Sequence, residues 1–335
     1  MRRVPLLLLL GLLLAIDLAY GQMPRFDQAG YARFVTELAE KCPFITVEQC
    51  GRSAAGTPLY LVRVRDPSAD RRPGLRMALQ AGQHGDEPLC TLAMMSWLDG
   101  LAEDTAHCAE LVRQFDLACV PAVNPDGQTR QTRENATKAD LNRDWLVCAQ
   151  PETNALRRLW ADFSPQVFVD LHDLRADEPH GRAQLEGGLL PSHEARATQL
   201  AIQQELAARL GALMPVKSVE ASPELELVLA HRALAQALPG LGLSLLFESR
   251  DNLPDHLYFL EVLLEVVAKH QAELLPAAGR PPDKPQPPAP KPASRAANCL
   301  QQANSAHYDV HQPVRHLYDF SHLLALDVPQ HVRLL

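Results

Sequence analysis

Residues 75–101 read LRMALQAGQHGDEPLCTLAMMSWLDGL. The apolar start of this stretch predicts a buried strand, and the apolar end from Leu89 onward predicts a helix that Pro88 begins. In the turn between them, glycines flank His84, and Glu87 follows three residues later. A strand, a tight turn and a helix start in this order can direct the side chains of His84 and Glu87 into one crevice.

Strand-like and helical segments alternate outward from this stretch, and the strands are mostly unbroken apolar runs. Such strands are typical of a sheet that is covered on both faces. The sequence therefore predicts an α/β fold: a mixed, mainly parallel, twisted sheet in a three-layer α/β/α arrangement. Strands are expected at 44–50, 57–65, 75–81, 115–120, 166–171 and 241–247, and helices at 25–41, 89–101, 152–163, 193–211, 223–238 and 255–275.

The composition narrows the class of protein. The chain has 335 residues, 47% of them hydrophobic, and a net charge of −8. These values exclude a disordered chain, a collagen and a polytopic membrane protein. The acidic balance also argues against a nucleic-acid partner.

The N-terminus has the pattern of a secretory signal peptide. Arg2 and Arg3 precede an apolar run over 4–16, and small residues before Gln22 form a cleavage site. We expect a signal peptide at 1–21 and a secreted or periplasmic protein, with a retained membrane anchor as the alternative. No later segment is apolar enough to span a bilayer, so no membrane span is expected after the signal is removed.

The rest of the chain divides into three parts by composition. Residues 22–275 form the expected main domain, which the motifs below make the catalytic domain. Residues 276–295 are a proline-rich linker, and 296–335 are a C-terminal segment too short for a core of its own.

The mature chain keeps seven cysteines, an odd number. Cys42 and Cys50 are close enough in sequence to pair across a turn. Cys90 lies in an apolar run and is expected to be a buried thiol.

The metal-ligand pattern His-x-x-Glu occurs three times, so its context must choose among them. His107 and His270 lie on amphipathic helical stretches, where a solvated helix face explains the pattern. Only His84 follows a predicted strand and precedes a helix start.

Polar residues also follow three other predicted strands, and Asn124 and Asp126 follow the strand at 115–120. His172 follows the strand at 166–171, and Glu248 follows the strand at 241–247. In open α/β sheets, ligands bind outside the carboxyl ends of the strands. Two histidines and one glutamate form a zinc set that leaves a coordination position for water.

The motifs resemble those of the zinc carboxypeptidase family, the carboxypeptidase A-like metallopeptidases. They occur in the family's order, and the resemblance covers about residues 75–250. The matching pieces are HGDEP at 84–88, NPDG at 124–127, RENA at 133–136, DLNR at 140–143, DLH at 170–172 and FESR at 247–250.

The resemblance implies a metal centre. His84, Glu87 and His172 would bind one zinc ion per chain. Asp140 would orient His84 from the side away from the metal, fixing its tautomer.

The resemblance also implies roles in catalysis and in substrate binding. Glu248 would be the general base, and Arg133 would stabilise the oxyanion, with Arg130 as a rival for that role. Asn142 and Arg143 would clamp the terminal carboxylate of the substrate.

The sequence departs from the family pattern in three places. Asp144 follows the carboxylate clamp, where it would repel a C-terminal carboxylate unless it points away. No tyrosine occurs between Tyr60 and Tyr258, so the mobile substrate tyrosine of the digestive members has no counterpart. Arg232 is a candidate for the side-chain pocket, where it would favour acidic residues.

These features favour a monomeric zinc metallocarboxypeptidase that acts on peptides, with murein peptides as one natural substrate in a bacterial envelope. The runner-up is a related zinc amidohydrolase: a deacylase of N-acyl amino acids or a murein-peptide amidase. A non-catalytic peptide-binding protein on the same fold is the alternative from another class.

Overall fold

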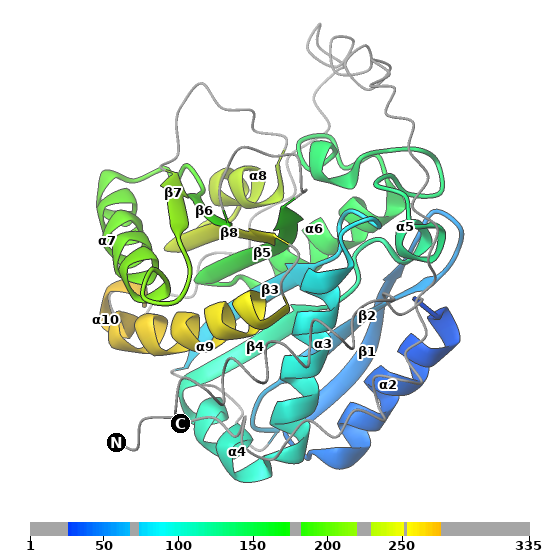
Figure 1. Cartoon of the computed structure of the whole chain (residues 1–335), viewed down its shortest axis with the longest axis horizontal. Coiled ribbons are helices and arrows are strands. Elements are labelled where there is room, and N and C mark those ends of the chain that lie inside the picture. The colour runs from blue at the N-terminus through cyan, green and yellow to red at the C-terminus, as the bar shows by residue number, and fades with distance from the viewer. Residues whose placement is uncertain (1–25, 68–73, 175–181, 220–228, 251–252, 276–335) are drawn as a thin grey trace, which may run out of the picture. The chain divides into compact units, whose positions relative to one another are not determined.

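The computed structural model describes residues 26–67, 74–174, 182–219, 229–250 and 253–275 (Figure 1). The expected signal peptide, proline-rich linker and C-terminal segment lie outside these residues. All the strands, and all the helices after α2, belong to one compact unit, Val35–Ala306. None of the described helices is both long and apolar enough to cross a bilayer.

The described strands form one eight-stranded sheet in the order β1-β2-β4-β3-β5-β8-β6-β7. The central strands β4, β3, β5 and β8 run parallel, whereas β1, β2 and the β6–β7 pair join them through antiparallel pairings. The mixed, mainly parallel sheet that the sequence predicted is confirmed. Its strands are β1 Ile45–Arg52, β2 Pro58–Val64, β3 Leu75–Ala81, β4 Phe115–Val120, β5 Val167–Leu174, β6 Ala183–Gly187, β7 Val216–Val219 and β8 Leu243–Arg250.

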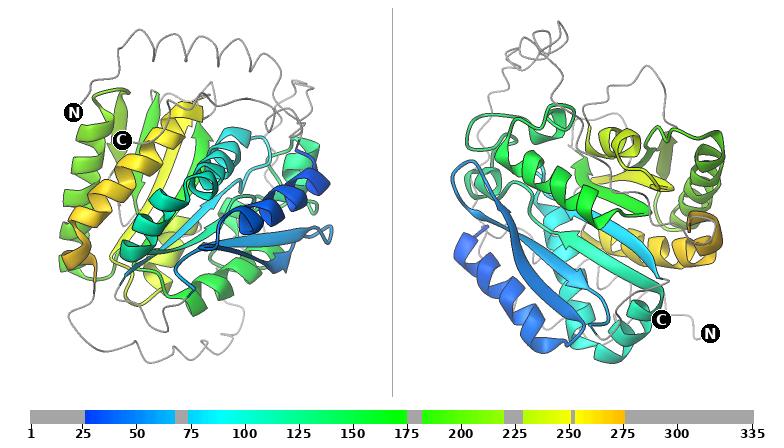
Figure 2. Two further views of the ribbon diagram at one scale, coloured as in Figure 1. Left: turned by 90° about the horizontal axis from the view of Figure 1, so that it is seen from below. Right: turned by 180° about the vertical axis from the view of Figure 1, so that it is seen from behind.

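Helices cover both faces of this sheet. In Figure 2, α6 and α8 lie on one face, and α3, α7 and α9 lie on the other. The helices are α2 Gln28–Lys41, α3 Pro88–Glu103, α4 Thr105–Gln114, α5 Pro125–Arg130, α6 Pro151–Phe163, α7 His193–Leu210, α8 Ala230–Ala237, α9 Leu253–Lys269 and α10 Gln271–Leu274, with a 3-10 turn at Leu141–Arg143.

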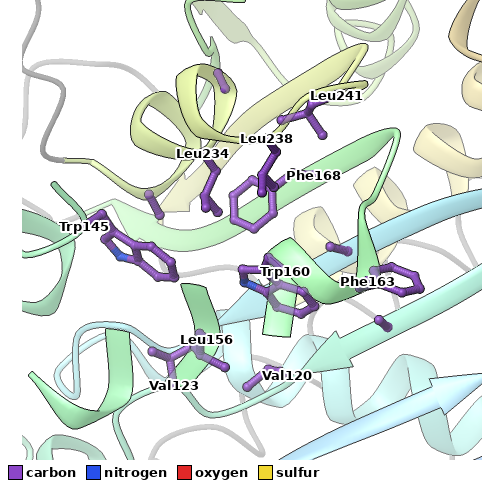
Figure 3. Packing of buried hydrophobic residues seen from close by; sticks show 14 of the residues in the cluster. Val120, Val123, Trp145, Leu156, Trp160, Phe163, Phe168, Leu234, Leu238 and Leu241 are labelled. Atoms are coloured by element: carbon purple, nitrogen blue, oxygen red, sulfur yellow. The ribbon is translucent and has the colours of Figure 1, made fainter. Parts of the chain in front are cut away.

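A buried hydrophobic cluster fills the space between the sheet and helices α6 and α8. Trp160 of α6 packs edge-on against Phe168 of β5, with ring centroids 6.2 Å apart (Figure 3). Leu234 of α8 and Trp145 of the loop before α6 belong to the same cluster. This cluster packs on the same face of the sheet that carries the polar residues described below.

The two strands with the sequence-predicted ligands are longer than expected. β5 continues through His172 to Leu174, and β8 continues through Glu248 to Arg250. The strands pair with each other over this extension, from His172↔Glu248 to Leu174↔Arg250. Both polar residues therefore lie inside paired strands rather than after them.

Other boundaries also differ from the prediction. The sequence reading missed α4, α5 and the short strands β6 and β7. The helix expected at 223–238 is described only as α8, because residues 220–228 lie outside the described part. The helix expected at 255–275 is broken at His270 into α9 and α10.

The six described cysteines are free thiols, so Cys42 and Cys50, which are close enough in sequence to pair across a turn, form no disulfide with each other. Cys50 lies in β1, and its thiol donates to the carbonyl oxygen of Leu59 in the paired strand β2, 3.5 Å away. The expectation for Cys90 is confirmed, since it is fully buried and its thiol donates to the carbonyl oxygen of Glu87 at 3.2 Å.

Candidate metal site and active site

Among the described residues, His84, Glu87 and His172 form a group that can hold a metal ion. One potential ligand atom from each lies within 4.8 Å of the others. The Nδ1 atoms of both histidines face the Glu87 carboxylate, His84 at 2.6 Å from Oε1 and His172 at 2.8 Å from Oε2. All three residues are buried.

The turn that carries His84 and Glu87 is held by a close backbone approach. A Cβ atom on Gly85 would lie 1.9 Å from the carbonyl carbon of Gly127, so no larger residue fits there. Asn124 donates its side-chain amide to the carbonyl oxygens of Gln83, at 3.1 Å, and of Arg133, at 3.3 Å. The NPDG segment therefore joins the histidine turn to the arginine segment.

Asp140 and Arg133 complete the half of the site around His84. The Nε2 atom of His84 lies 3.1 Å from Asp140 Oδ1. Arg133 donates through Nε to Asp140 Oδ2 at 3.0 Å and through Nη1 to Glu87 Oε1 at 3.3 Å. Arg130, the rival for the oxyanion role, ends α5 and is exposed.

The surroundings of Glu87 set its charge. Burial acts to raise the pKa of the Glu87 carboxyl, but the imidazoles of His84 and His172 together outweigh burial and hold it below its usual range. Glu87 is therefore ionised at neutral pH, which is the state that a metal ligand needs.

Glu248 is placed by the register of the sheet. It is the in-register neighbour of His172 across the parallel β5–β8 pair, and it is half-buried. Registered neighbours in a sheet point their side chains to the same face. Glu248 therefore stands on the face that carries His172.

The structure gives the two residues of the expected carboxylate clamp different environments. Arg143 is exposed. Asn142 is buried, with its Nδ2 atom 3.3 Å from His172 Nε2, and its Oδ1 atom accepts from the backbone N–H of Ala230 at 3.0 Å. Asn142 thus connects His172 to the start of α8.

Asp144 points away from this clamp. Its carboxylate accepts from the backbone N–H groups of Ala149 and Gln150, at 3.0 and 2.8 Å, and from the Thr153 hydroxyl. It satisfies donors at the start of α6 and is buried, which agrees with the alternative that Asp144 points away and does not repel a substrate carboxylate.

Arg232 is neutralised inside the protein. It is buried and donates through Nε to Glu186 Oε1 at 2.7 Å, and His231 contacts the same oxygen at 2.8 Å. A guanidinium already paired in this way is a poor receptor for an acidic substrate residue, so the expectation for Arg232 is not supported.

The sequence reading gave no role to Asp170. This carboxylate is fully buried, and its Oδ2 atom lies 3.2 Å from His172 Nε2. The sequence could have indicated this contact, because Asp170 and His172 are two residues apart in a strand and so share a face of the sheet.

The residues present fit a zinc ion. Two imidazole nitrogens and a carboxylate converge on one point, and the opposite nitrogen of each ring faces a further carboxylate, from Asp140 or Asp170. Zinc sites with catalytic function have this donor set, and the histidines in them have such outer partners.

The comparisons with known proteins agree with this geometry. Residues 31–175 match the model of the zinc carboxypeptidase family. Carboxypeptidase 2 of Trichophyton rubrum is 33% identical over 150 residues, which are 45% of this chain and 26% of that protein. The matched region thus spans about a quarter of that relative's length. The resemblance seen in the motifs is confirmed.

Solved structures show the same fold. A metallo-carboxypeptidase from Burkholderia cenocepacia has a TM-score of 0.62 at 22% identity, covering 72% of this chain and 68% of that chain. A metallo-carboxypeptidase from Pseudomonas aeruginosa has a TM-score of 0.59 at 23% identity, covering 73% and 68%. The predicted zinc cofactor is confirmed at the level of the family, and the described residues provide a cluster that can bind the ion.

Proposed function

We propose that the protein is a zinc metallocarboxypeptidase that hydrolyses a C-terminal peptide bond. The observation that carries this proposal is the convergence of His84, Glu87 and His172, with Glu248 in register beside His172. The family match and the fold of the solved structures support the same activity.

The side chains have distinct roles in this proposal. A zinc ion held by His84, Glu87 and His172 would supply Lewis acidity, lowering the pKa of water and polarising a carbonyl group. Glu248 accepts a proton from the attacking water and delivers it to the amine nitrogen as the C–N bond breaks. Arg133 stabilises the oxyanion that forms on the carbonyl oxygen.

Arg143 gives the reaction its direction along the peptide. Its exposed guanidinium can bind the terminal carboxylate through two parallel hydrogen bonds. Asn142 supports this end of the site by holding His172 and the start of α8.

The location and the natural substrate belong to the same proposal. The signal-peptide pattern at 1–21 supports export, and a periplasmic enzyme of this class would meet murein peptides. The chemistry proposed here does not depend on the compartment.

Glu248→Gln is the direct test of the mechanism. The variant keeps the zinc ligands, so it should bind one zinc ion per chain and lose about 10²–10⁴-fold in kcat on a hippuryl-type peptide. Zinc content by mass spectrometry and peptide hydrolysis measure the two properties separately. Unchanged turnover would remove Glu248 from the mechanism.

A substrate comparison separates the competing activities. Hydrolysis of hippuryl-type peptides supports the carboxypeptidase, whereas cleavage of N-acyl amino acids alone supports the deacylase. Tight zinc binding with no hydrolysis of either class would favour the non-catalytic binding protein.

A further inference from the structure

We propose that Asp170 is a positioning residue for His172, and that two tryptophan–glutamine pairs in the hydrophobic core hold Asp170 in place. The inference rests on the proposed function, since it concerns how one of the zinc ligands is oriented. It assigns a role to five buried residues outside the proposed zinc ligand set: Asp170, Gln80, Gln83, Trp145 and Trp160.

His172 lies between two carboxylates. Its Nδ1 atom is 2.8 Å from Glu87 Oε2, and its Nε2 atom is 3.2 Å from Asp170 Oδ2. Both His172 and Asp170 are essentially inaccessible to solvent, at 1% and 0% exposure. An ionised carboxylate in such a place is costly unless donors surround it.

Two glutamine amides supply those donors. Gln80 donates through Nε2 to Asp170 Oδ1 at 3.2 Å, and Gln83 donates through Nε2 to Asp170 Oδ2 at 2.5 Å. Both glutamines are fully buried. Asp170 thus receives hydrogen bonds from two directions and faces the imidazole in a third.

Two tryptophans fix which way the glutamines point. Trp160 donates its indole N–H to Gln80 Oε1 at 3.0 Å, and Trp145 donates to Gln83 Oε1 at 2.6 Å. An indole N–H can only donate, so the oxygen of each glutamine amide must face the tryptophan. The NH₂ groups are therefore left to face Asp170.

This order of donors and acceptors selects one tautomer of His172. Three polar groups face His172 Nε2: Asp170 Oδ2 at 3.2 Å, and the amide nitrogens of Asn142 and Gln83 at 3.3 and 3.4 Å. The Asp170 oxygen is the nearest of the three and the one acceptor among them, so a hydrogen on Nε2 is directed at Asp170. The lone pair is then on Nδ1, which is the nitrogen that faces Glu87 and would bind the metal. The chain of contacts thus transmits the orientation of two indoles to one ligand atom.

The indoles are rigid anchors because they are packed in the core. Trp145 is 1% exposed and Trp160 is 0% exposed, and both belong to the cluster between the sheet and helices α6 and α8 (Figure 3). Close-packed side chains of this size do not change rotamer without disturbing their neighbours. The hydrophobic core therefore sets the angle of the metal ligand.

Asp170→Asn tests the inference with the smallest change of shape. The asparagine oxygen can replace only one carboxylate oxygen, and its NH₂ group must oppose a glutamine NH₂. We expect a zinc dissociation constant raised by about 10–100-fold, measured by competition with a chromophoric chelator. We also expect a shift of the His172 ring-nitrogen resonances in ¹⁵N NMR, which a merely structural role would not produce.

Asp126→Asn is the matched control. Asp126 is also a buried carboxylate, 2% exposed, but it accepts from Ala55 N and Thr57 Oγ1 in the β1–β2 turn, at 2.8 and 2.9 Å. Both of its carboxylate oxygens are bound by this turn, so zinc affinity should stay within about twofold of the unmodified protein.

Gln83→Leu decides the question if Asp170→Asn fails to fold. This variant keeps the carboxylate but removes one of its two amide donors, and zinc affinity should fall by about tenfold. Zinc affinity within twofold of the unmodified protein in every folded variant of this pair would overturn the inference. Failure of the unmodified protein to bind zinc would instead refute the proposed function. This measurement uses the unmodified protein alone, so the two failures are distinguishable.

Discussion

His84 stands in a turn between β3 and α3, whereas His172 lies inside β5. The outer partner of His84 is Asp140, whose side chain is 21% exposed and also binds Arg133. The outer partner of His172 is Asp170, whose side chain is 0% exposed and is bound by two core glutamines. One ligand is thus held by a surface loop and its ion pairs, and the other by the packed interior.

The two halves of the site therefore differ in their exposure to solvent and in what holds them. The half of the site around His84, here called the loop half, contains Asp140, Arg133 and Arg143. In the proposed function, Arg133 and Arg143 bind the substrate and stabilise the charge that develops on it. The half around His172, here called the core half, contains Asp170, Gln80 and Gln83. All three are buried, and they hold His172 in a fixed orientation. Mutations in the two halves should therefore have different consequences for binding and for stability.

Removal of either His84 or His172 should cause the largest loss of zinc affinity. His84→Ala and His172→Ala each delete a ligand, so each should weaken zinc binding by more than about 100-fold, beyond the range of outer-partner changes. The two variants should differ in the unfolding free energy of the metal-free protein. His172→Ala leaves the buried Asp170 carboxylate short of a partner and should cost about 1–3 kcal/mol more in unfolding free energy than His84→Ala.

Zinc titration and urea unfolding measure the two quantities. His231→Gln is the control, because His231 is a buried histidine beside a carboxylate, Glu186, outside the proposed ligand set. Equal stability losses for the two alanine variants would contradict the contrast drawn between the halves.

Gly85→Ala should damage the loop half next. The added Cβ would meet the backbone of Gly127 at 1.9 Å, so the turn that carries His84 and Glu87 must move. We expect a loss of about 1–3 kcal/mol in unfolding free energy, together with weaker zinc binding. Gly100→Ala in α3 meets nothing within 4 Å and should be neutral or stabilising by up to about 1 kcal/mol. A neutral Gly85→Ala would show that the turn is not held by this contact.

Asp140→Asn should change the zinc affinity more than it changes the stability of the protein. The loss of the carboxylate that faces His84 Nε2 should raise the zinc dissociation constant by about tenfold. Because Asp140 and Arg133 are both partly exposed, the unfolding free energy should change by less than about 1 kcal/mol. If this variant destabilises the metal-free protein as much as Asp170→Asn does, the loop half is as rigid as the core half.

Zinc binding itself should produce the smallest and most local difference. We expect zinc to slow amide hydrogen exchange in the turn at 82–87 more than in β5, where paired strands and the Asp170 network already restrict His172. Exchange measured by mass spectrometry with and without zinc gives this comparison on one sample. Greater protection in β5 than in the turn would reverse the assignment of the rigid half.

The loop half could be predicted from the sequence because its residues form local patterns. His84 and Glu87 are three residues apart, and glycines and a proline mark the turn that carries them. The apolar runs likewise identified the central strands, whereas the short strands β6 and β7 were missed. β6 has only five residues and includes the polar Gln184 and Glu186, so it lacks the pattern of a buried strand.

The core half could not be assembled from the sequence. Gln80 and Gln83 are about 90 residues from Asp170, and their tryptophan partners come from two further segments. Only the pairing of β3 with β5, and the packing of α6 and the loop before it on that face, bring these groups together. The register that places Glu248 beside His172 is long-range in the same sense.

The most direct test of the metal site is X-ray absorption at the zinc edge on the zinc-loaded full chain. We expect two imidazole nitrogens and carboxylate or water oxygens at about 2.0–2.2 Å, with one imidazole signal lost in His172→Ala. A sulfur neighbour at about 2.3 Å, or an unchanged spectrum in His172→Ala, would contradict the His84–Glu87–His172 site.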